Sequence, residues 1–202
     1  MFKENRSITA RVKEAFHPRP IRNRVMEALF KLKIQLSRLD RTAQKMQQRD
    51  SSLYGKCVKA VQEKNTQLAS MYAGECAEIR KMAKVVLQSQ LALEQVALRL
   101  DTVLHYGDVA QAMRPVASVV RTIRTQLEGV LPDVSIELAS VNESLEYLVM
   151  EVGEATEQSF DVSISGQDAQ RILDEANIVA EQKMRERFPD LPPVPTPEAR
   201  VQ

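Results

Sequence analysis

The sequence of 202 residues predicts an all-α protein, an elongated molecule built on one long antiparallel helical hairpin with shorter helices after it. The first observation is composition: 6 Gly, 9 Pro, 5 Phe, 4 Tyr and no Trp are too few turn formers and aromatic residues for a β-sandwich or a doubly wound α/β enzyme. The second is the absence of proline from residues 21–114, which admits unusually long helices because proline breaks helix interiors. The third is a repeat of apolar residues every seven positions, which indicates long packed helices.

The hairpin is expected to span residues 21–106. Apolar residues recur at heptad spacing from Val25 to Ala60, and a second apolar series runs from Leu68 to Val103. Each series predicts one helix that buries a single stripe. Two helices joined by a short polar turn form an antiparallel hairpin.

Residues 63–66 form that polar turn, and Thr66 is the expected cap of the second helix. In such a hairpin, facing residues have numbers that sum to about 129. This register places Gly55 opposite Gly74. Because glycine in a helix interior costs roughly 1 kcal/mol relative to alanine, the pair indicates a close backbone approach, a flexible joint or a coincidence.

Two cysteines and an aspartate also lie in the hairpin stripe. Cys57 and Cys76 would be offset by about 6 Å along the helix axes, and the spacing of packed helices then puts them too far apart for a disulfide. They are expected to be buried small apolar side chains. Asp50 is the polar interruption in the stripe of the first helix.

The remaining segments follow from shorter patterns. An apolar heptad runs from Val134 to Val152, and Ser165 with Asp168 makes a capping box for a last helix. The expected segments are a basic amphipathic segment at 1–17, regulatory or polymerisation helices at 108–152, a flexible linker at 153–165, a C-terminal helix at 166–188 and a proline-rich motif at 189–197.

The N-terminal segment has the pattern of a short basic amphipathic helix. Ile8, Val12 and Phe16 recur at helical spacing, with lysine and arginine around them. Such a helix binds in the interface of an anionic membrane, although a frayed tail or a partner-docking helix has the same pattern. The candidate membrane-binding residues are Phe2, Lys3, Arg6, Ile8, Arg11, Val12, Lys13 and Phe16.

Charge is divided unequally along the chain. Residues 1–126 hold 23 Lys/Arg and 11 Asp/Glu, a net charge of +12, whereas residues 127–202 hold 5 and 16, a net charge of −11. The acidic half is therefore expected to fold back on the basic hairpin, where it competes with anionic surfaces for the same side chains.

The sequence contains no recognisable catalytic motif. We find no glycine-rich phosphate loop, no metal-ligand spacing and no nucleophile elbow. We therefore expect no catalytic residue, no metal site, no cofactor and no enzymatic activity. No apolar run reaches the length of a membrane span, and the N-terminus leads into no secretory signal, so a cytoplasmic protein is expected.

Several stretches resemble the ESCRT-III proteins, and more closely the archaeal cell-division ESCRT-III proteins of the CdvB type. They are residues 78–81 (EIRK), 92–100 (ALEQVALRL), 107–109 (GDV) and 113–116 (MRPV). The similarity extends over roughly residues 20–195, and the order of the stretches together with the charge split makes it specific. The chain looks like a shorter paralogue, without the winged-helix segment that some CdvB-type proteins carry at their end.

This resemblance implies a subunit that polymerises, with itself or with paralogues, on the inner face of the cell membrane at the division site. The filaments constrict or sever the division neck. It also implies a second partner, an AAA-type ATPase whose MIT domain grips a proline-rich motif and remodels the polymer. The matching positions in this sequence are Phe188, Pro189, Leu191, Pro192, Val194 and Pro195.

Two other functions fit part of the sequence. A nucleic-acid-binding protein would explain the 15 Lys/Arg against 5 Asp/Glu in residues 1–60, but few aromatic residues are present to stack on bases. No specific nucleic acid is therefore expected as a partner. A soluble coiled-coil adaptor would explain the heptads, but neither the charge split nor the proline-rich end.

Overall fold

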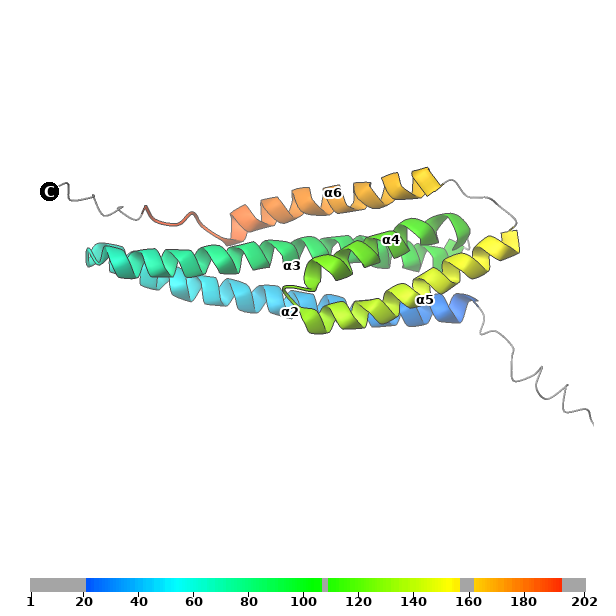
Figure 1. Cartoon of the computed structure of the whole chain (residues 1–202), viewed down its shortest axis with the longest axis horizontal. Helices are drawn as coiled ribbons and strands as arrows, with labels where there is room; N and C mark the ends of the chain where they lie inside the picture. The colour runs from blue at the N-terminus through cyan, green and yellow to red at the C-terminus, as the bar shows by residue number, and fades with distance from the viewer. Residues whose placement is uncertain (1–20, 107–108, 157–161, 194–202) are drawn as a thin grey trace, which may run out of the picture.

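The computed structural model describes residues 21–106, 109–156 and 162–193, and over these residues the chain is α-helical with no strand (Figure 1). The predicted all-α class is confirmed. Across the described part, no helix combines the length and the apolar character that crossing a membrane requires. The helices are α2 (Ile21–Gln62), α3 (Thr66–Tyr106), α4 (Val109–Leu127), α5 (Pro132–Thr156) and α6 (Val162–Arg187).

Helices α2 and α3 form the predicted hairpin, and the turn between them shows how the chain reverses. Lys64 has a φ of 56°, in the left-handed region that ends a helix. The Asn65 side-chain oxygen accepts a hydrogen bond from the backbone N–H of Leu68 at 3.1 Å. Asn65 is therefore the N-cap of α3, and the prediction of Thr66 as the cap is wrong by one residue because Thr66 is already helical.

The hairpin register agrees with the predicted sum of about 129. Asp50 pairs with Arg80 across the two helices, and the Cys57 thiol lies 3.5 Å from the Ala69 carbonyl oxygen. The residue numbers sum to 130 for Asp50 and Arg80 and to 126 for Cys57 and Ala69, on either side of the predicted value. The heptad pattern and the position of the turn therefore fix the register.

The glycine pair is not a close approach. Gly55 and Gly74 are both exposed, and a Cβ added to either would meet no other atom within 4 Å. Of the three alternatives, the close backbone approach is wrong, because other residues form the seam between the helices. Among them, Cys57 and Cys76 are buried free thiols, as predicted.

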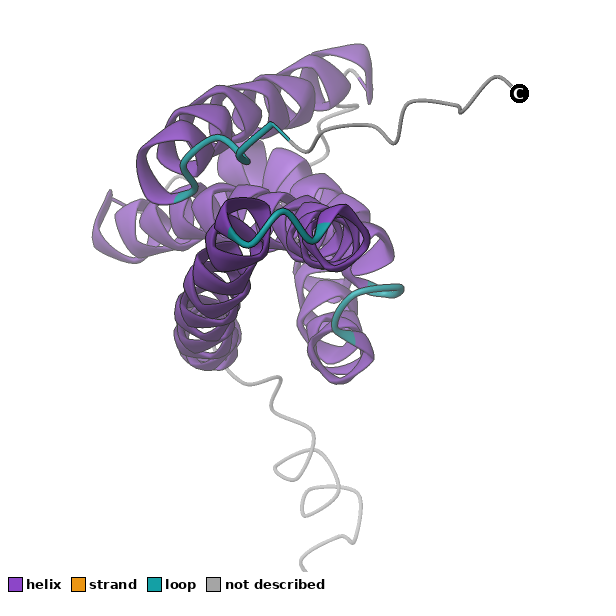
Figure 2. Ribbon diagram, turned by 90° about the vertical axis from the view of Figure 1, so that its left-hand side faces the viewer, coloured by secondary structure: helices purple, strands orange, loops and turns teal. Residues whose placement is uncertain are grey.

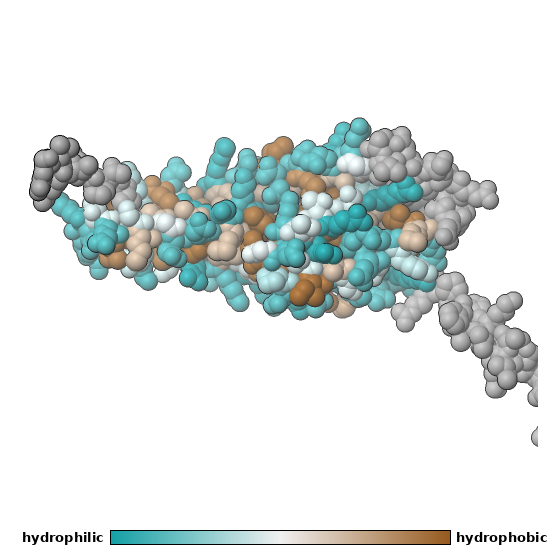
Figure 3. Space-filling view, viewed as in Figure 1, coloured by the Kyte–Doolittle hydropathy of each residue, from teal (hydrophilic) through white to brown (hydrophobic). Residues whose placement is uncertain are grey.

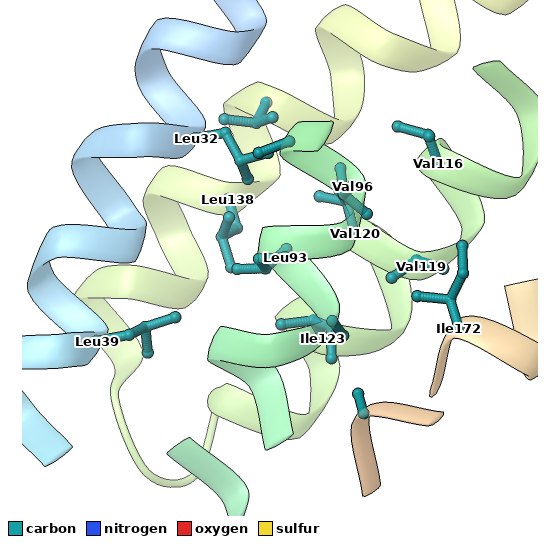
Figure 4. Close-up of a cluster of buried hydrophobic side chains, with 14 of the residues drawn as sticks. Leu32, Leu39, Leu93, Val96, Val116, Val119, Val120, Ile123, Leu138 and Ile172 are labelled. Atoms are coloured by element: carbon teal, nitrogen blue, oxygen red, sulfur yellow. The ribbon is translucent and has the colours of Figure 1, made fainter. Parts of the chain in front are cut away.

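The three later helices lie along the hairpin. Helix α5 runs beside α2, and α6 runs beside α3 and α4, so the tip of the hairpin extends beyond them (Figure 1). Viewed from the hairpin tip, the helices form a bundle rather than a single layer (Figure 2). Side chains from all five helices meet in one core (Figure 4), including Leu32, Leu39, Leu93, Val96, Val116, Val119, Val120, Ile123, Leu138 and Ile172.

The predicted linker at 153–165 is too long at both ends. Helix α5 continues to Thr156 and α6 begins at Val162, so only residues 157–161 fall outside the described part. The capping box of Ser165 with Asp168 does not mark the start of the last helix, because α6 already begins at Val162. Gly153 and Gly166 are both helical, and glycine in a helix costs only about 1 kcal/mol. Unlike proline, it does not remove a backbone hydrogen bond.

Candidate functional site

The two predicted sets of site residues have different outcomes. The eight candidate membrane-binding residues, from Phe2 to Phe16, lie outside the described residues, as do Val194 and Pro195 of the proline-rich motif. The structure does describe Phe188, Leu191 and the residues between them, together with Pro192. The site can therefore be built at the end of α6, where the motif begins.

The site begins with an ion pair inside the hairpin. The Asp50 side chain is 2% exposed, and its two carboxylate oxygens accept hydrogen bonds from Arg80 Nε at 2.7 Å and Arg80 Nη2 at 3.0 Å. The hydrogen bond to Asp50 raises the pKa of Arg80 above its usual value. This bidentate geometry uses the planar fork of the guanidinium and holds it in one orientation.

The remaining guanidinium nitrogen of Arg80 bonds the chain at the end of α6. Arg80 Nη1 donates a hydrogen bond to the Pro189 carbonyl oxygen at 2.7 Å, and the guanidinium lies 5.8 Å from the centroid of the Phe188 ring. Phe188 itself is buried, whereas Pro189 is exposed. The first residue of the predicted ATPase motif is thus packed on the hairpin, and the sequence analysis missed Arg80 as its anchor. The sequence feature that could have indicated Arg80 is Asp50, because a carboxylate buried in an apolar stripe is stable only when it is paired with a cation.

The neighbouring thiol is shielded rather than reactive. Burial, followed by the Asp50 charge, raises the pKa of Cys76 to about 11. A reactive cysteine needs a lowered pKa and access to solvent. Cys76 therefore has the environment of a packing residue.

Further ion pairs join the acidic half of the chain to the basic half. Glu151 of α5 accepts a hydrogen bond from Arg24 of α2 at 2.7 Å, and Lys84 of α3 lies 2.9 Å from Glu181 of α6. The contact with Lys84 lowers the pKa of Glu181. The acidic helices thus lie on the basic hairpin in the arrangement expected from the charge split.

One face of α2 keeps its positive charge uncovered. Arg38, Arg41 and Lys45 line a cleft of about 480 Å³ where α2 meets the start of α5 at Pro132 and Asp133. On the face shown in Figure 3, hydrophilic side chains dominate and apolar patches are scattered. The cleft can attract phosphate or carboxylate groups, because three cations line it against the single carboxylate of Asp133.

The described residues thus form an all-α protein in which a long basic hairpin carries acidic helices folded back on it. The comparison with protein families matches residues 27–199 to the Snf7 family. The chain therefore belongs to the Snf7 family, the ESCRT-III proteins, and it is of the CdvB type that the sequence resembles.

Two curated proteins of Sulfolobus acidocaldarius are similar over most of this chain. Cell division protein B1 is 42% identical over 173 residues, which cover 86% of this chain and 81% of that protein. Cell division protein B is 34% identical over 172 residues, which cover 85% of this chain and 66% of that protein. No solved structure gives a significant match.

Proposed function

We propose that the protein is a filament subunit that polymerises on anionic membrane and constricts or severs the neck of a dividing cell. An AAA-type ATPase with an MIT domain then disassembles the filament. Membership of the Snf7 family and the names of the two relatives support the cell-division role. The proposed work is mechanical: the subunit acts through assembly and needs no catalytic residue.

The observation that carries the proposal is the contact between the acidic helices and the basic hairpin. Arg24 and Lys84 are held by Glu151 and Glu181, and these pairs are partly or well exposed. Exposed ion pairs contribute about 0–1 kcal/mol each, so a few of them with apolar docking favour a closed monomer by a few kcal/mol. Membrane phosphates or a neighbouring subunit can overturn a gap of that size.

The test uses full-length variants, because removing α4 to α6 would expose the core side chains of α3. Glu181→Lys places two cations together and should loosen α6, which increases assembly and binding to vesicles that contain anionic lipid. The charge swap Lys84→Glu/Glu181→Lys should restore the closed state. Glu175→Lys is the matched control, because it adds the same charge to an exposed position of α6.

Negative-stain electron microscopy would show filaments or rings, and cosedimentation with vesicles would measure membrane binding. If the parent chain, Glu181→Lys and Glu175→Lys form filaments equally well, the contact between Lys84 and Glu181 does not control assembly, and that part of the proposal is wrong. If neither the parent chain nor any variant assembles on anionic vesicles, the proposal that the protein is a filament subunit is wrong.

The membrane contact is proposed to lie in residues 1–17. Lysine and arginine near an anionic surface contribute about 1 kcal/mol each, and this segment also offers apolar side chains for insertion. Deleting residues 1–17 should weaken vesicle binding and leave helicity nearly unchanged. If binding persists, the cleft of Arg38, Arg41 and Lys45 is the membrane face, and Arg38→Glu should then abolish binding.

The ATPase contact is proposed to lie in the proline-rich motif. An extended proline-rich segment loses little entropy when it docks in a groove between helices. Leu191→Asp with Val194→Asp should abolish binding of the purified MIT domain and leave assembly intact. Leu98→Asp, at an apolar position 68% exposed on α3, is the control. Undiminished affinity by calorimetry would exclude the motif.

Nucleic-acid binding is the second candidate function, and the uncovered cations of α2 favour it. A DNA titration at the salt concentration of the vesicle assay separates the two. Tighter binding to DNA, with a steep dependence on salt, would favour this alternative.

A further inference from the structure

Two exposed apolar stripes lie on the outer faces of α2 and α5. Among the described residues ten large apolar side chains are exposed, and six of them belong to these two helices. The six are Met26, Phe30 and Ile34 of α2 and Ile136, Tyr147 and Met150 of α5. Their spacing is four residues on α2 and three and eleven residues on α5, so each set of three shares one face of its helix. Apolar side chains gathered in this way mark a surface for a partner.

The α2 stripe points away from α5 within the subunit. Arg24 and Lys31 are the α2 side chains that reach α5, where they bond Glu151 and Ser140. Met26 follows Arg24 by two residues, which places it about 200° around the helix from that contact. The two stripes therefore do not cover each other in one molecule.

The surroundings of the two stripes carry opposite charge. Residues 22–41 of α2 hold six Lys/Arg and two Asp/Glu, whereas residues 133–151 of α5 hold no Lys/Arg and five Asp/Glu. Contact between two α2 stripes, or between two α5 stripes, would bring like charges together. The charges thus favour a contact in which the α2 stripe of one copy meets the α5 stripe of another.

We propose that the α2 stripe of one copy packs antiparallel on the α5 stripe of the next copy. The proposal rests on the proposed function, because it names the contact that propagates the filament. The facing pairs, whose residue numbers sum to 176 or 177, are Met26 with Met150, Phe30 with Tyr147 and Lys33 with Glu143. The first two pairs bury apolar side chains, and the third joins two exposed charges of opposite sign. A parallel contact through the same two aromatic residues would instead set Met26 against Glu143.

The same register places successive copies side by side. Within one subunit α2 and α5 already run antiparallel (Figure 1), and the numbers of Arg24 and Glu151 sum to 175. A sum of 176 or 177 between copies therefore keeps them pointing the same way, with an axial shift of only about 2 Å. Because each copy uses a different face toward each neighbour, the contact continues as a ring or a filament. Helix α6 packs on α3 and α4, so its loosening leaves both stripes in place.

The test uses the fact that the two sides of the contact differ. In the full chain, Lys33→Glu or Glu143→Lys sets like charges against each other, and each variant alone should assemble on anionic vesicles several-fold less than the parent chain. An equal mixture of the two variants should recover assembly. In alternating order, one contact keeps the original charges and the next pairs the reversed ones.

The controls reverse a charge elsewhere. Arg49→Glu changes an exposed position of α2 that lies sixteen residues after Lys33, about 160° around the helix from it, and Glu175→Lys changes an exposed position of α6. Both should assemble like the parent chain. Sedimentation with vesicles measures membrane binding, and negative-stain electron microscopy shows the filaments.

Loss of assembly in each variant, with recovery in the mixture, would support the contact. If either variant assembles as well as the parent chain, the contact is wrong and the filament stands. If that variant also binds vesicles less well than Arg49→Glu does, lipid rather than a second copy covers the stripe. Loss in both variants without recovery in the mixture would likewise overturn the pairing of Lys33 with Glu143. A parent chain that never assembles would overturn the proposed function together with the contact.

Discussion

Arg24 and Glu151 are separated by 127 positions in the chain, and their side chains meet at 2.7 Å. The pair joins the first turns of α2 to the last part of α5. Both side chains are three-quarters or more buried, and Arg24 also stacks on Tyr147. The contact therefore closes the α2–α5 interface at the end of the molecule opposite the hairpin tip (Figure 1).

Glu151→Gln should loosen that end. The substitution keeps the shape and removes the charge, so the cost should be about 1 kcal/mol or somewhat less. Hydrogen exchange should quicken in the last turns of α5 and leave the hairpin tip unchanged. Glu137→Gln, at an exposed position of the same helix, is the control. Equal exchange in both variants would mean that the ion pair does not hold the interface.

Arg80→Ala should be the most damaging single change in the hairpin. It leaves the Asp50 carboxylate buried without its cation, which typically costs about 3–5 kcal/mol. It also releases Pro189 and Phe188 from α3. Urea unfolding would give the loss of stability, and Lys84→Ala, at the exposed pair with Glu181, should cost far less than Arg80→Ala.

The double variant Asp50→Leu/Arg80→Met separates the two effects of Arg80. An apolar pair of similar volume removes the buried charge and should recover most of the stability of the hairpin. Phe188 should remain less protected, because the bond to the Pro189 carbonyl is still absent. If the double variant is as unstable as Arg80→Ala, the unpaired Asp50 carboxylate is not the main cause of the lost stability.

Acid should loosen the docking of the acidic helices. A hydrogen bond from Arg121 lowers the pKa of Glu146 below its ordinary 4.5, and Lys84 does the same for Glu181. A lowered pKa means that the folded state favours the ionised carboxylate. The stabilisation is therefore present above pH 4.5 and is lost as the pH falls through the lowered value.

Thermal unfolding measured from pH 7 to pH 3 would check this prediction. Glu146→Gln should lower the midpoint at pH 7 and reduce its fall on acidification. If the variant and the parent lose stability in parallel below pH 4.5, the ionisation of Glu146 is not linked to folding.

Gly55→Ala and Gly74→Ala should each raise stability by about 0.5–1 kcal/mol, because both positions are helical and have room for a Cβ. Chemical denaturation measures the gain. The same variants test the flexible-joint hypothesis. Normal filaments from the stabilised double variant would contradict it, whereas loss of assembly with gained stability would support it.

Local patterns in the sequence were sufficient for the helices of the hairpin. The heptads from Val25 to Ala60 and from Leu68 to Val103 predicted two helices whose ends the structure places at Gln62 and Tyr106. Helix periodicity depends on neighbours within one or two turns, so the chain shows it without knowledge of the fold. The helix ends on either side of the predicted linker 153–165 were placed less well, because α5 continues to Thr156 and α6 begins at Val162.

The sequence by itself determined the hairpin, its register, the buried cysteines and the division of charge between the two halves, since each follows from composition or short-range spacing. Only the tertiary structure decided which cation pairs with Asp50, that Phe188 packs beside it, and that α2 and α5 leave a groove between them. These relations join residues that are 30 to 127 positions apart. They depend on how whole helices dock, and that is set by the combined packing of five apolar stripes rather than by any one of them.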